Sequence, residues 1–203
     1  MSLTVYGDIY SGNCYKVKLL LCRLWLAHDW KHVDILQGES RSPEFLALNP
    51  NGRIPVLVDT GRVLCESNAI LHYLAHGSAL LPTDRYLHAQ VLQWQFFEQY
   101  SHEPCIATSR YIVRYLGSPS SRQAELEAKR DGGYAALAVM EQHLANGDYF
   151  VGTTPTIADL SLYAYTHVAH EGGFSLEKFP RIRAWLDRIA AAPGHVTMDQ
   201  FAP

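Results

Sequence analysis

Residues 49–57, Asn-Pro-Asn-Gly-Arg-Ile-Pro-Val-Leu, decide how the first part of this chain is interpreted. Pro55 directly precedes a run of apolar residues, and proline has no N–H to donate a hydrogen bond to a sheet. We therefore expect a turn at the start of a strand, with a cis peptide bond before the proline. Such a turn leaves the N–H and C=O groups of Ile54 without partners. Orphan backbone groups beside a cleft pair well with an extended peptide, which predicts a peptide-like ligand.

Residues 66–70, Glu-Ser-Asn-Ala-Ile, add an attraction for negative charge. Glu66 and Ser67 open a stretch whose apolar residues recur at helical spacing. Backbone amides at the N-terminus of a helix attract carboxylates. Together the two stretches predict a site for a small, acidic, peptide-like molecule.

The first 77 residues alternate strand-like and helical patterns, which predicts a thioredoxin-like α/β domain over residues 1–77. A βαβ unit with a right-handed crossover comes first, and an antiparallel hairpin and a closing helix follow it. The expected elements are strands over 3–6, 32–35, 56–59 and 63–64 and helices over 14–27 and 67–76.

Beyond a proline-containing linker over residues 78–84, no strand pattern remains. Apolar residues recur at helical spacing, so residues 85–203 are predicted to form an all-α helix bundle. The expected helices cover residues 88–116, 122–144, 157–170 and 176–191.

Composition narrows the function classes. The chain has 203 residues, and 48% hydrophobic residues are enough to fill a real core. It carries 17 basic and 20 acidic residues without a dense basic run, so nucleic acid is not an expected partner. The start lacks a charged region followed by an apolar signal core, and no apolar stretch is long enough for a membrane span. We therefore expect a cytoplasmic protein with a small-molecule ligand.

Metal ions and disulfides are not expected. Cys14, Cys22, Cys65 and Cys105 form neither a C-x-x-C pair nor a zinc pattern. The four-residue spacing of the two histidines at 72 and 76 also lacks an acidic or cysteine partner nearby in sequence, so a metal site is not predicted.

Four motifs in this order resemble the glutathione transferase family over nearly the whole chain. They are Ser11-Gly12-Asn13-Cys14, Ile54-Pro55, Glu66-Ser67 and Thr156-Ile157-Ala158-Asp159. The resemblance implies the same two-domain fold, glutathione as co-substrate, and a homodimer.

Thr156 and Asp159 have the spacing of a capping box, in which each side chain satisfies a backbone N–H of the first helical turn. Its role is structural, and the family resemblance implies that the matching element helps the second domain to fold.

Ser11 stands where thioredoxin-like redox proteins carry the first cysteine of C-x-x-C, so disulfide exchange within this motif is excluded. A hydroxyl can instead donate a hydrogen bond to a thiolate of the substrate. Ionising a thiol of pKa about 8.5 at pH 7 needs roughly 3 kcal/mol. One hydrogen bond to a charged group (~1.5 to 3 kcal/mol) and a helix N-terminus (~0.3 to 1 kcal/mol) reach that total.

Two neighbours compete for the sulfur contact. Ser11-x-Asn13 also fits bacterial family members that hold the thiol with an asparagine amide. We prefer Ser11 as the sulfur contact, and Asn13 remains the alternative. Cys14 is a third candidate, because a helix N-terminus lowers a thiol pKa. Helix periodicity nevertheless favours a packed Cys14 thiol.

The resemblance implies roles for the remaining site residues. The cysteine backbone of glutathione would lie against Ile54, beside Pro55. Glu66 would meet the α-ammonium, Ser67 the α-carboxylate, and Arg53 the glycine carboxylate. The family builds its electrophile pocket between the domains, for which Tyr10, Ile106, Arg110 and Tyr111 are the candidates.

The preferred function is transfer of the glutathione thiolate to small hydrophobic electrophiles, as in detoxification. One alternative keeps the fold and the ligand but reduces disulfides with glutathione. A second alternative is a non-catalytic ligand carrier or interaction platform. An isomerase is disfavoured, because the serine-serine-cysteine signature of maleylacetoacetate isomerase relatives is absent around Ser11.

Overall fold

The computed structural model describes residues 3–200, and its contacts divide the chain into two compact units. Among these residues, the first unit holds 3–78 and, in addition, 192–200, and the second runs from Ala79 to Ala191. Residues 192–200 thus differ from the sequence-based limits of the helical domain, 85–203. They belong to the first unit because they pack on it: the hydroxyl of buried Tyr15 donates to the C=O of Val196 at 2.7 Å.

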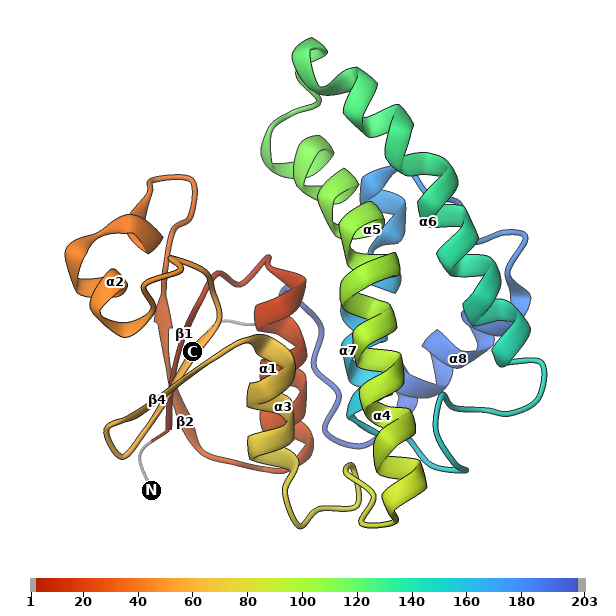
Figure 1. Ribbon diagram of the computed structural model, residues 1–203, viewed down its shortest axis with the longest axis horizontal. Coiled ribbons are helices and arrows are strands. Elements are labelled where there is room, and N and C mark those ends of the chain that lie inside the picture. Colours follow the sequence, from red (N-terminus) through yellow and green to blue (C-terminus); the bar gives the residue numbers. More distant parts are fainter. Residues whose placement is uncertain (1–2, 201–203) are drawn as a thin grey trace. The chain divides into compact units, whose positions relative to one another are not determined.

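The first unit is a four-stranded mixed sheet with helices on both faces, which confirms the thioredoxin-like fold. The strand order is β2-β1-β3-β4, with β1 parallel to β2 and antiparallel to β3. α1 and α3 cover one face and α2 covers the other (Figure 1). Its elements are β1 (Leu3–Gly7), α1 (Gly12–Arg23), β2 (His28–His32), η1 (Glu39–Arg41), α2 (Pro43–Leu48), β3 (Val56–Asp59), β4 (Arg62–Cys65) and α3 (Ser67–Ala75).

The local sequence explains most of these elements. Leu3, Val5 and Gly7 of β1 are buried and alternate with partly exposed residues, as the period of two in a strand requires. The β3–β4 hairpin turns at Thr60 and Gly61, whose φ angles of 48° and 85° match a type I′ turn. The predicted antiparallel hairpin is therefore confirmed.

Two predictions for this unit differ from the structure. The second strand covers His28–His32 instead of residues 32–35, because it is an edge strand of mostly polar residues that pairs with β1 through its backbone. α2 was not predicted; it is only six residues long and is defined by its N-cap, Ser42, and by Pro43 in its first turn.

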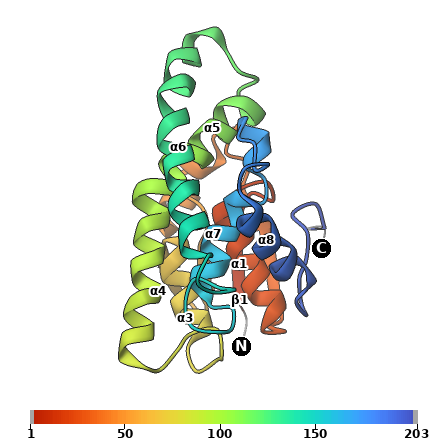
Figure 2. The ribbon, with the colours of Figure 1, turned by 90° about the vertical axis from the view of Figure 1, so that its right-hand side faces the viewer.

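The second unit is entirely helical among its described elements, which confirms the predicted bundle. α7 is buried along its whole length and packs against α4, α5 and α8 (Figure 2). The elements are α4 (Arg85–Phe97), η2 (Glu98–His102), α5 (Glu103–Arg110), η3 (Tyr111–Tyr115), η4 (Ser120–Arg122), α6 (Gln123–His143), α7 (Ile157–Thr166), η5 (Ala169–Gly172) and α8 (Pro180–Ala191).

The predicted long helix over residues 88–116 is one continuous run from Arg85 to Tyr115 that contains two π-helical segments. The first, η2, directly precedes the turn that holds Pro104. Because proline has no N–H to donate, the regular α-helical ladder is interrupted near this residue. Across residues 3–200, no helix has the length and apolar character needed to cross a membrane.

The capping box at α7 is confirmed. Thr156 Oγ1 accepts a hydrogen bond from the N–H of Ala158 at 3.2 Å, and Asp159 Oδ2 accepts one from the N–H of Thr156 at 2.8 Å. Asp159 is fully buried and also accepts from Phe150 N–H at 3.1 Å and Trp185 Nε1 at 2.9 Å. This carboxylate therefore connects α7 to α8 and to the loop before α7.

Candidate functional site

At one end of the sheet, which we call its β1–β3–β4 edge, the segments predicted to bind the ligand lie close together. Tyr6 pairs with Val56 across β1 and β3, and Val56 pairs with Cys65 across β3 and β4. The end of β1, the start of β3 and the end of β4 therefore lie side by side. The loop to Ser11, the turn at Ile54 and the start of α3 follow directly from these three strand ends.

The turn before β3 has the predicted geometry. The Ile54–Pro55 peptide bond is cis, and Pro55 is buried. Asn49 stabilises the turn: its Nδ2 donates to the C=O of Arg53 at 2.7 Å and its Oδ1 accepts from Asn51 N–H at 3.1 Å. Within residues 3–200, neither the N–H nor the C=O of Ile54 makes a hydrogen bond. Both groups are therefore available to a ligand.

Glu66 adopts an unusual backbone conformation at the start of α3. It occupies the N-cap position with φ 68° and ψ 114°, a region that residues other than glycine rarely adopt, and its side chain is exposed. Strain of this kind costs on the order of 1–3 kcal/mol and concentrates at functional sites. Ser67 follows as the first helical residue and is buried.

Ser11 is the N-cap of α1, so its structural role and its predicted chemical role coincide in one side chain. Its Oγ accepts a long hydrogen bond of 3.5 Å from the N–H of Cys14. The Ser11 side chain also hydrogen-bonds the Cys14 thiol, an interaction that lowers the pKa of this thiol against the larger, raising effect of burial. The hydroxyl thus sits at the positive end of the α1 dipole, where a bound sulfur would compete with Cys14 for its one hydrogen.

Cys14 is fully buried, and burial raises the pKa of its thiol to about 12. The thiol is therefore protonated at neutral pH. This finding agrees with a packed Cys14 and argues against a thiolate at this position.

Asn13 and Ser67 meet between the first turns of α1 and α3. Ser67 Oγ donates to Asn13 Oδ1 at 3.1 Å. The structure therefore joins two predicted site residues that are 54 positions apart in the chain.

Two cations near this edge were not predicted. Arg41 donates through Nη1 to the C=O of Asn51 at 3.1 Å and packs against Gly52, whose φ of 62° and missing side chain leave room for it. Lys16 is fully buried in α1, and its Nζ lies 3.4 Å from Asn68 Oδ1. Lys16 could have been noticed in the sequence, because a lysine between Tyr15 and Val17 on an apolar helix is unusual. No sequence pattern points to Arg41, because its loop has no periodicity.

Arg53 is exposed, as expected of a residue that pairs with a ligand carboxylate. Within residues 3–200, no group of three or more histidine, cysteine, aspartate or glutamate side chains is arranged to hold a metal ion.

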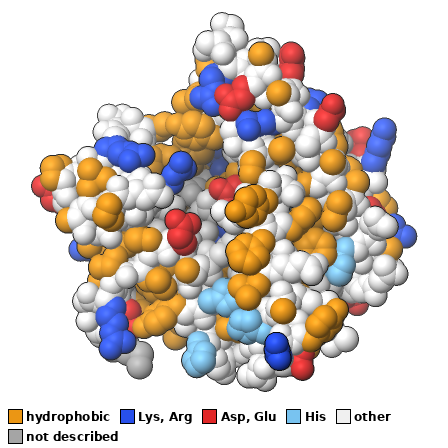
Figure 3. Space-filling model, in the orientation of Figure 1, with side chains coloured by type: hydrophobic (Ala, Val, Ile, Leu, Met, Phe, Trp, Pro, Cys, Tyr) orange, Lys and Arg blue, Asp and Glu red, His pale blue; other side chains and the backbone are white. Residues whose placement is uncertain are grey.

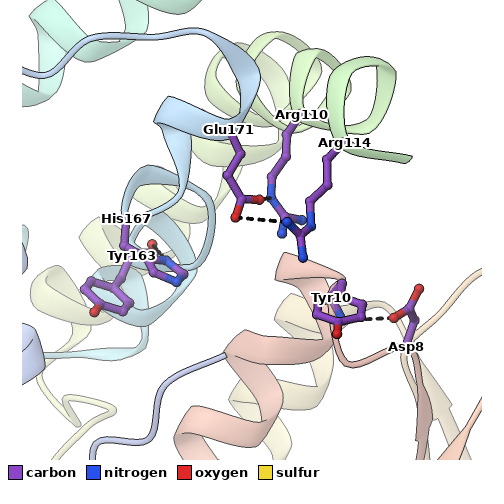
Figure 4. A network of polar contacts seen from close by, with 7 residues as sticks. All are labelled: Asp8, Tyr10, Arg110, Arg114, Tyr163, His167 and Glu171. Atoms are coloured by element: carbon purple, nitrogen blue, oxygen red, sulfur yellow. Dashed lines mark hydrogen bonds and ion pairs between the residues drawn. The ribbon is translucent and has the colours of Figure 1, made fainter. Parts of the chain in front are cut away.

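The four candidates for the electrophile pocket differ in exposure. In the first unit, Tyr10 is exposed and its N–H donates to Asp8 Oδ1 at 2.8 Å (Figure 4). In the helical unit, Tyr111 is also exposed. Ile106 is fully buried, which favours a role in core packing.

Arg110 is almost completely buried and forms an ion pair that was not predicted. Its Nε donates to Glu171 Oε2 at 2.6 Å, and Arg114 Nη1 lies 3.4 Å from Glu171 Oε1 (Figure 4). Glu171 thus forms ion pairs with both Arg110 and Arg114. The pair could not be predicted from local sequence spacing, since Glu171 lies 61 residues beyond Arg110.

Comparisons with known proteins agree with this geometry. The family model of the glutathione S-transferase N-terminal domain matches residues 10–76, and that of the C-terminal domain matches residues 94–193. Both models thus match the parts of the chain that the structure separates into two units.

Three relatives illustrate the similarity. A crystal structure of a glutathione S-transferase from Pseudomonas fluorescens is 54% identical, with a TM-score of 0.95 over 97% of this chain and 98% of that one. Glutathione S-transferase 1 of Schizosaccharomyces pombe is 32% identical over 94% of this chain and 92% of its own length. Ure2p, solved in complex with glutathione, is 27% identical with a TM-score of 0.85, covering 95% of this chain and 90% of that chain. The chain belongs to the glutathione S-transferase family.

Proposed function

We propose that this protein binds glutathione at the β1–β3–β4 edge of its first unit and transfers the glutathione thiolate to a small hydrophobic electrophile. The observation that supports this proposal most is that three features lie close together at the β1–β3–β4 edge. These are the unused backbone groups of Ile54, the strained helix start at Glu66, and the N-capping hydroxyl of Ser11.

Each end of the tripeptide has a chemically matched partner in this proposal. The cysteine backbone of glutathione pairs with the N–H and C=O of Ile54. The exposed Glu66 carboxylate meets the α-ammonium, and the backbone N–H of Ser67 meets the α-carboxylate at the N-terminus of α3, while the Ser67 hydroxyl donates to Asn13. The exposed Arg53 guanidinium pairs with the glycine carboxylate.

The Ser11 hydroxyl donates a hydrogen bond to the sulfur and stabilises the thiolate, while the thiol proton leaves to solvent. The thiolate attacks an electrophilic carbon, a carbon–sulfur bond forms, and the leaving group departs with its bonding electrons. Asn13 is the rival donor, through its amide nitrogen. Cys14 is not a candidate for this step, because its thiol is buried and protonated.

Tyr10, Arg110 and Tyr111 remain the proposed contacts of the electrophile, whereas Ile106 is fully buried and packs in the core of the helical unit.

We also propose that the protein forms a homodimer through α4 and the adjoining η2. Leu92 and Phe96 of α4 and Tyr100 of η2 recur every fourth residue and are exposed, Phe96 by 61% and Tyr100 by 83%. Hydrophobic side chains gather along this helix in Figure 3. An exposed apolar stripe of this kind is typical of an interaction surface.

The similarity to Ure2p favours a second candidate. That protein was solved with glutathione bound, and its name states no transferase activity. A protein that binds glutathione without turnover would use the same edge.

Glutathione binding and turnover are separated by two measurements on the purified protein. We expect glutathione to raise the melting temperature and to be conjugated to chlorodinitrobenzene. Binding without conjugation would support the second candidate, and the absence of any shift at saturating glutathione would overturn both.

Ser11→Ala tests the sulfur contact. We expect kcat/KM to fall by about 10- to 100-fold, as loss of one hydrogen bond to a charged group predicts. The matched control is Ser42→Ala, because Ser42 also caps a helix, accepting from Phe45 N–H at 3.2 Å, and lies outside the proposed glutathione contacts. It should lose comparable stability and keep full activity. Equal activity losses in both variants would remove Ser11 from the mechanism.

A further inference from the structure

The first unit contains a cavity that the proposed glutathione site does not use. Its volume is about 540 Å³, within the range of about 300–1,000 Å³ typical of small-molecule sites. Several of its lining residues belong to α2. This helix covers the face of the sheet opposite α1 and α3 (Figure 1). The walls of the cavity come from β1, the segment after β2, η1 and α2. The lining residues are Tyr6, Val33, Glu39, Ser42, Glu44, Phe45 and Leu48.

The inner wall of this cavity is apolar and well packed. Val33 and Phe45 are buried and form a hydrophobic cluster with Val56, against which Tyr6 and Leu48 also pack. The wall therefore has a fixed shape and offers aromatic and branched aliphatic surface. Such a surface suits a flat apolar group of a ligand.

The charged groups that line the cavity are both acidic. Glu44 is exposed, and within residues 3–200 its carboxylate has no hydrogen-bond or ion-pair partner. Glu39 Oε2 accepts from the N–H of Asp34 at 2.7 Å, which leaves its second oxygen for another donor.

Two cations lie beside this cavity without lining it. Lys31 Nζ donates to the hydroxyl of Tyr6 at 3.1 Å and lies 5.0 Å from the centre of its ring, and Arg41 Nη1 donates to the C=O of Asn51 at 3.1 Å. The charged side chains of the lining itself are therefore both negative.

An apolar wall below two carboxylates is complementary to an aromatic group that carries a positive charge. We propose that this cavity is a second small-molecule site, and that its ligand is a primary arylalkyl ammonium ion. The aromatic ring packs against Phe45, Leu48 and Val33, and the ammonium donates charge-assisted hydrogen bonds to Glu44 and Glu39. None of the lining residues belongs to the proposed glutathione contacts, so the two sites fill independently.

The test is a titration of the protein with phenethylammonium chloride, followed by the amide NMR signals, in the presence of saturating glutathione. We expect saturable shifts confined to the amides of Tyr6, Val33, Glu39 and residues 44–48. Phenethyl alcohol and phenylpropionate match the ring but carry no charge or a negative charge, and should bind at least about tenfold more weakly.

Glu44→Gln should weaken phenethylammonium binding by about tenfold, and Glu39→Gln together with Glu44→Gln should weaken it further. The control is Glu177→Gln, which removes an exposed carboxylate from the helical unit and should leave binding unchanged. The amide spectrum of each variant reports whether it is folded.

Three results would overturn the proposal. Equal binding of the alcohol would show that charge is not recognised. Wild-type affinity in the folded double variant would exclude the two carboxylates. Displacement of the amine by glutathione would place it in the glutathione site.

Discussion

Ser67 Oγ donates a hydrogen bond of 3.1 Å to Asn13 Oδ1, which ties the first turn of α3 to the first turn of α1. The same contact orients the Asn13 amide, because an oxygen that accepts from Ser67 directs the nitrogen elsewhere. Asn13 is therefore as well placed to position Ser67 as to hold a sulfur atom.

Because of this contact, we expect substitutions of Ser11 and Asn13 to have different effects on the thiol pKa and on glutathione binding. Ser11→Ala should move the pKa of the bound glutathione thiol back toward about 8.5, since it removes the donor to the thiolate. Asn13→Ala should weaken glutathione binding through Ser67 and leave that pKa in place. The ultraviolet absorbance of the thiolate, followed against pH, measures both. If Asn13→Ala raises the pKa and Ser11→Ala does not, the asparagine amide holds the sulfur.

The strained backbone of Glu66 predicts a conflict between stability and activity. Glu66→Gly removes the steric cost of φ 68°, so the melting temperature should stay level or rise. Glu66→Ala keeps that cost and should not gain stability. Both variants lose the carboxylate proposed for the α-ammonium, so both should raise the KM for glutathione. A Glu66→Gly variant that is less stable than Glu66→Ala would show that the conformation is not strained.

Cys14 should resist alkylation. Burial raises the pKa of its thiol to about 12, so almost no thiolate exists at pH 8, and the side chain has no exposed surface. After brief iodoacetamide treatment, peptide mass spectrometry should find Cys14 unmodified and the partly exposed Cys105 modified. Cys14→Ala should keep its glutathione-transferring activity. Rapid labelling of Cys14, with loss of activity, would reverse its assignment as a packed residue.

Asp159→Ala should destabilise the helical unit by about 3 kcal/mol or more. Its carboxylate accepts from two groups of Thr156, from Phe150 N–H and from Trp185 Nε1, and the alanine leaves these buried donors without an acceptor. Thermal unfolding measures the change. The control is Asp131→Ala, an exposed position on α6, where a change within about 0.5 kcal/mol is expected. Similar melting temperatures for the two variants would contradict this role.

His28 makes the stability of the first unit depend on pH. Burial lowers its pKa, and the neighbouring Lys18 ammonium, at 3.2 Å from Nε2, acts in the same direction. The folded pKa lies below the unfolded value of about 6.5. The stabilising effect is therefore present above that value and is lost as pH falls through the folded pKa.

The urea midpoint should accordingly fall between about pH 7.5 and pH 5.5, a window that spans the histidine titration. The fall should be smaller in His28→Gln. His76→Gln, at an exposed position of the first unit, is the control and should behave like the wild type. An unchanged slope in His28→Gln would assign the pH dependence to other groups.

The sequence predicts features whose physical cause is local. Pro55 indicates the cis turn, the four-residue motif from Thr156 to Asp159 indicates its own capping box, and the glycine at 61 indicates the hairpin. Each depends on dihedral preferences or hydrogen bonds within a few residues, so spacing alone reveals it.

Features that depend on distant partners are not predictable in this way. The bond of Trp185 to Asp159 and the ion pair of Arg110 with Glu171 arise only when helices pack. The edge strand β2 was misplaced because its polar residues carry no buried pattern, and its position is set by pairing with β1. For the site, the motifs were found from sequence, whereas the contact between Ser67 and Asn13 required the fold.

The return of residues 192–200 to the first unit has a consequence for biosynthesis. The buried Tyr15 hydroxyl finds its acceptor, Val196, 181 positions later. On the ribosome, the thioredoxin-like unit therefore emerges before the segment that supplies this acceptor, and the contact can form only after the whole helical unit has been translated.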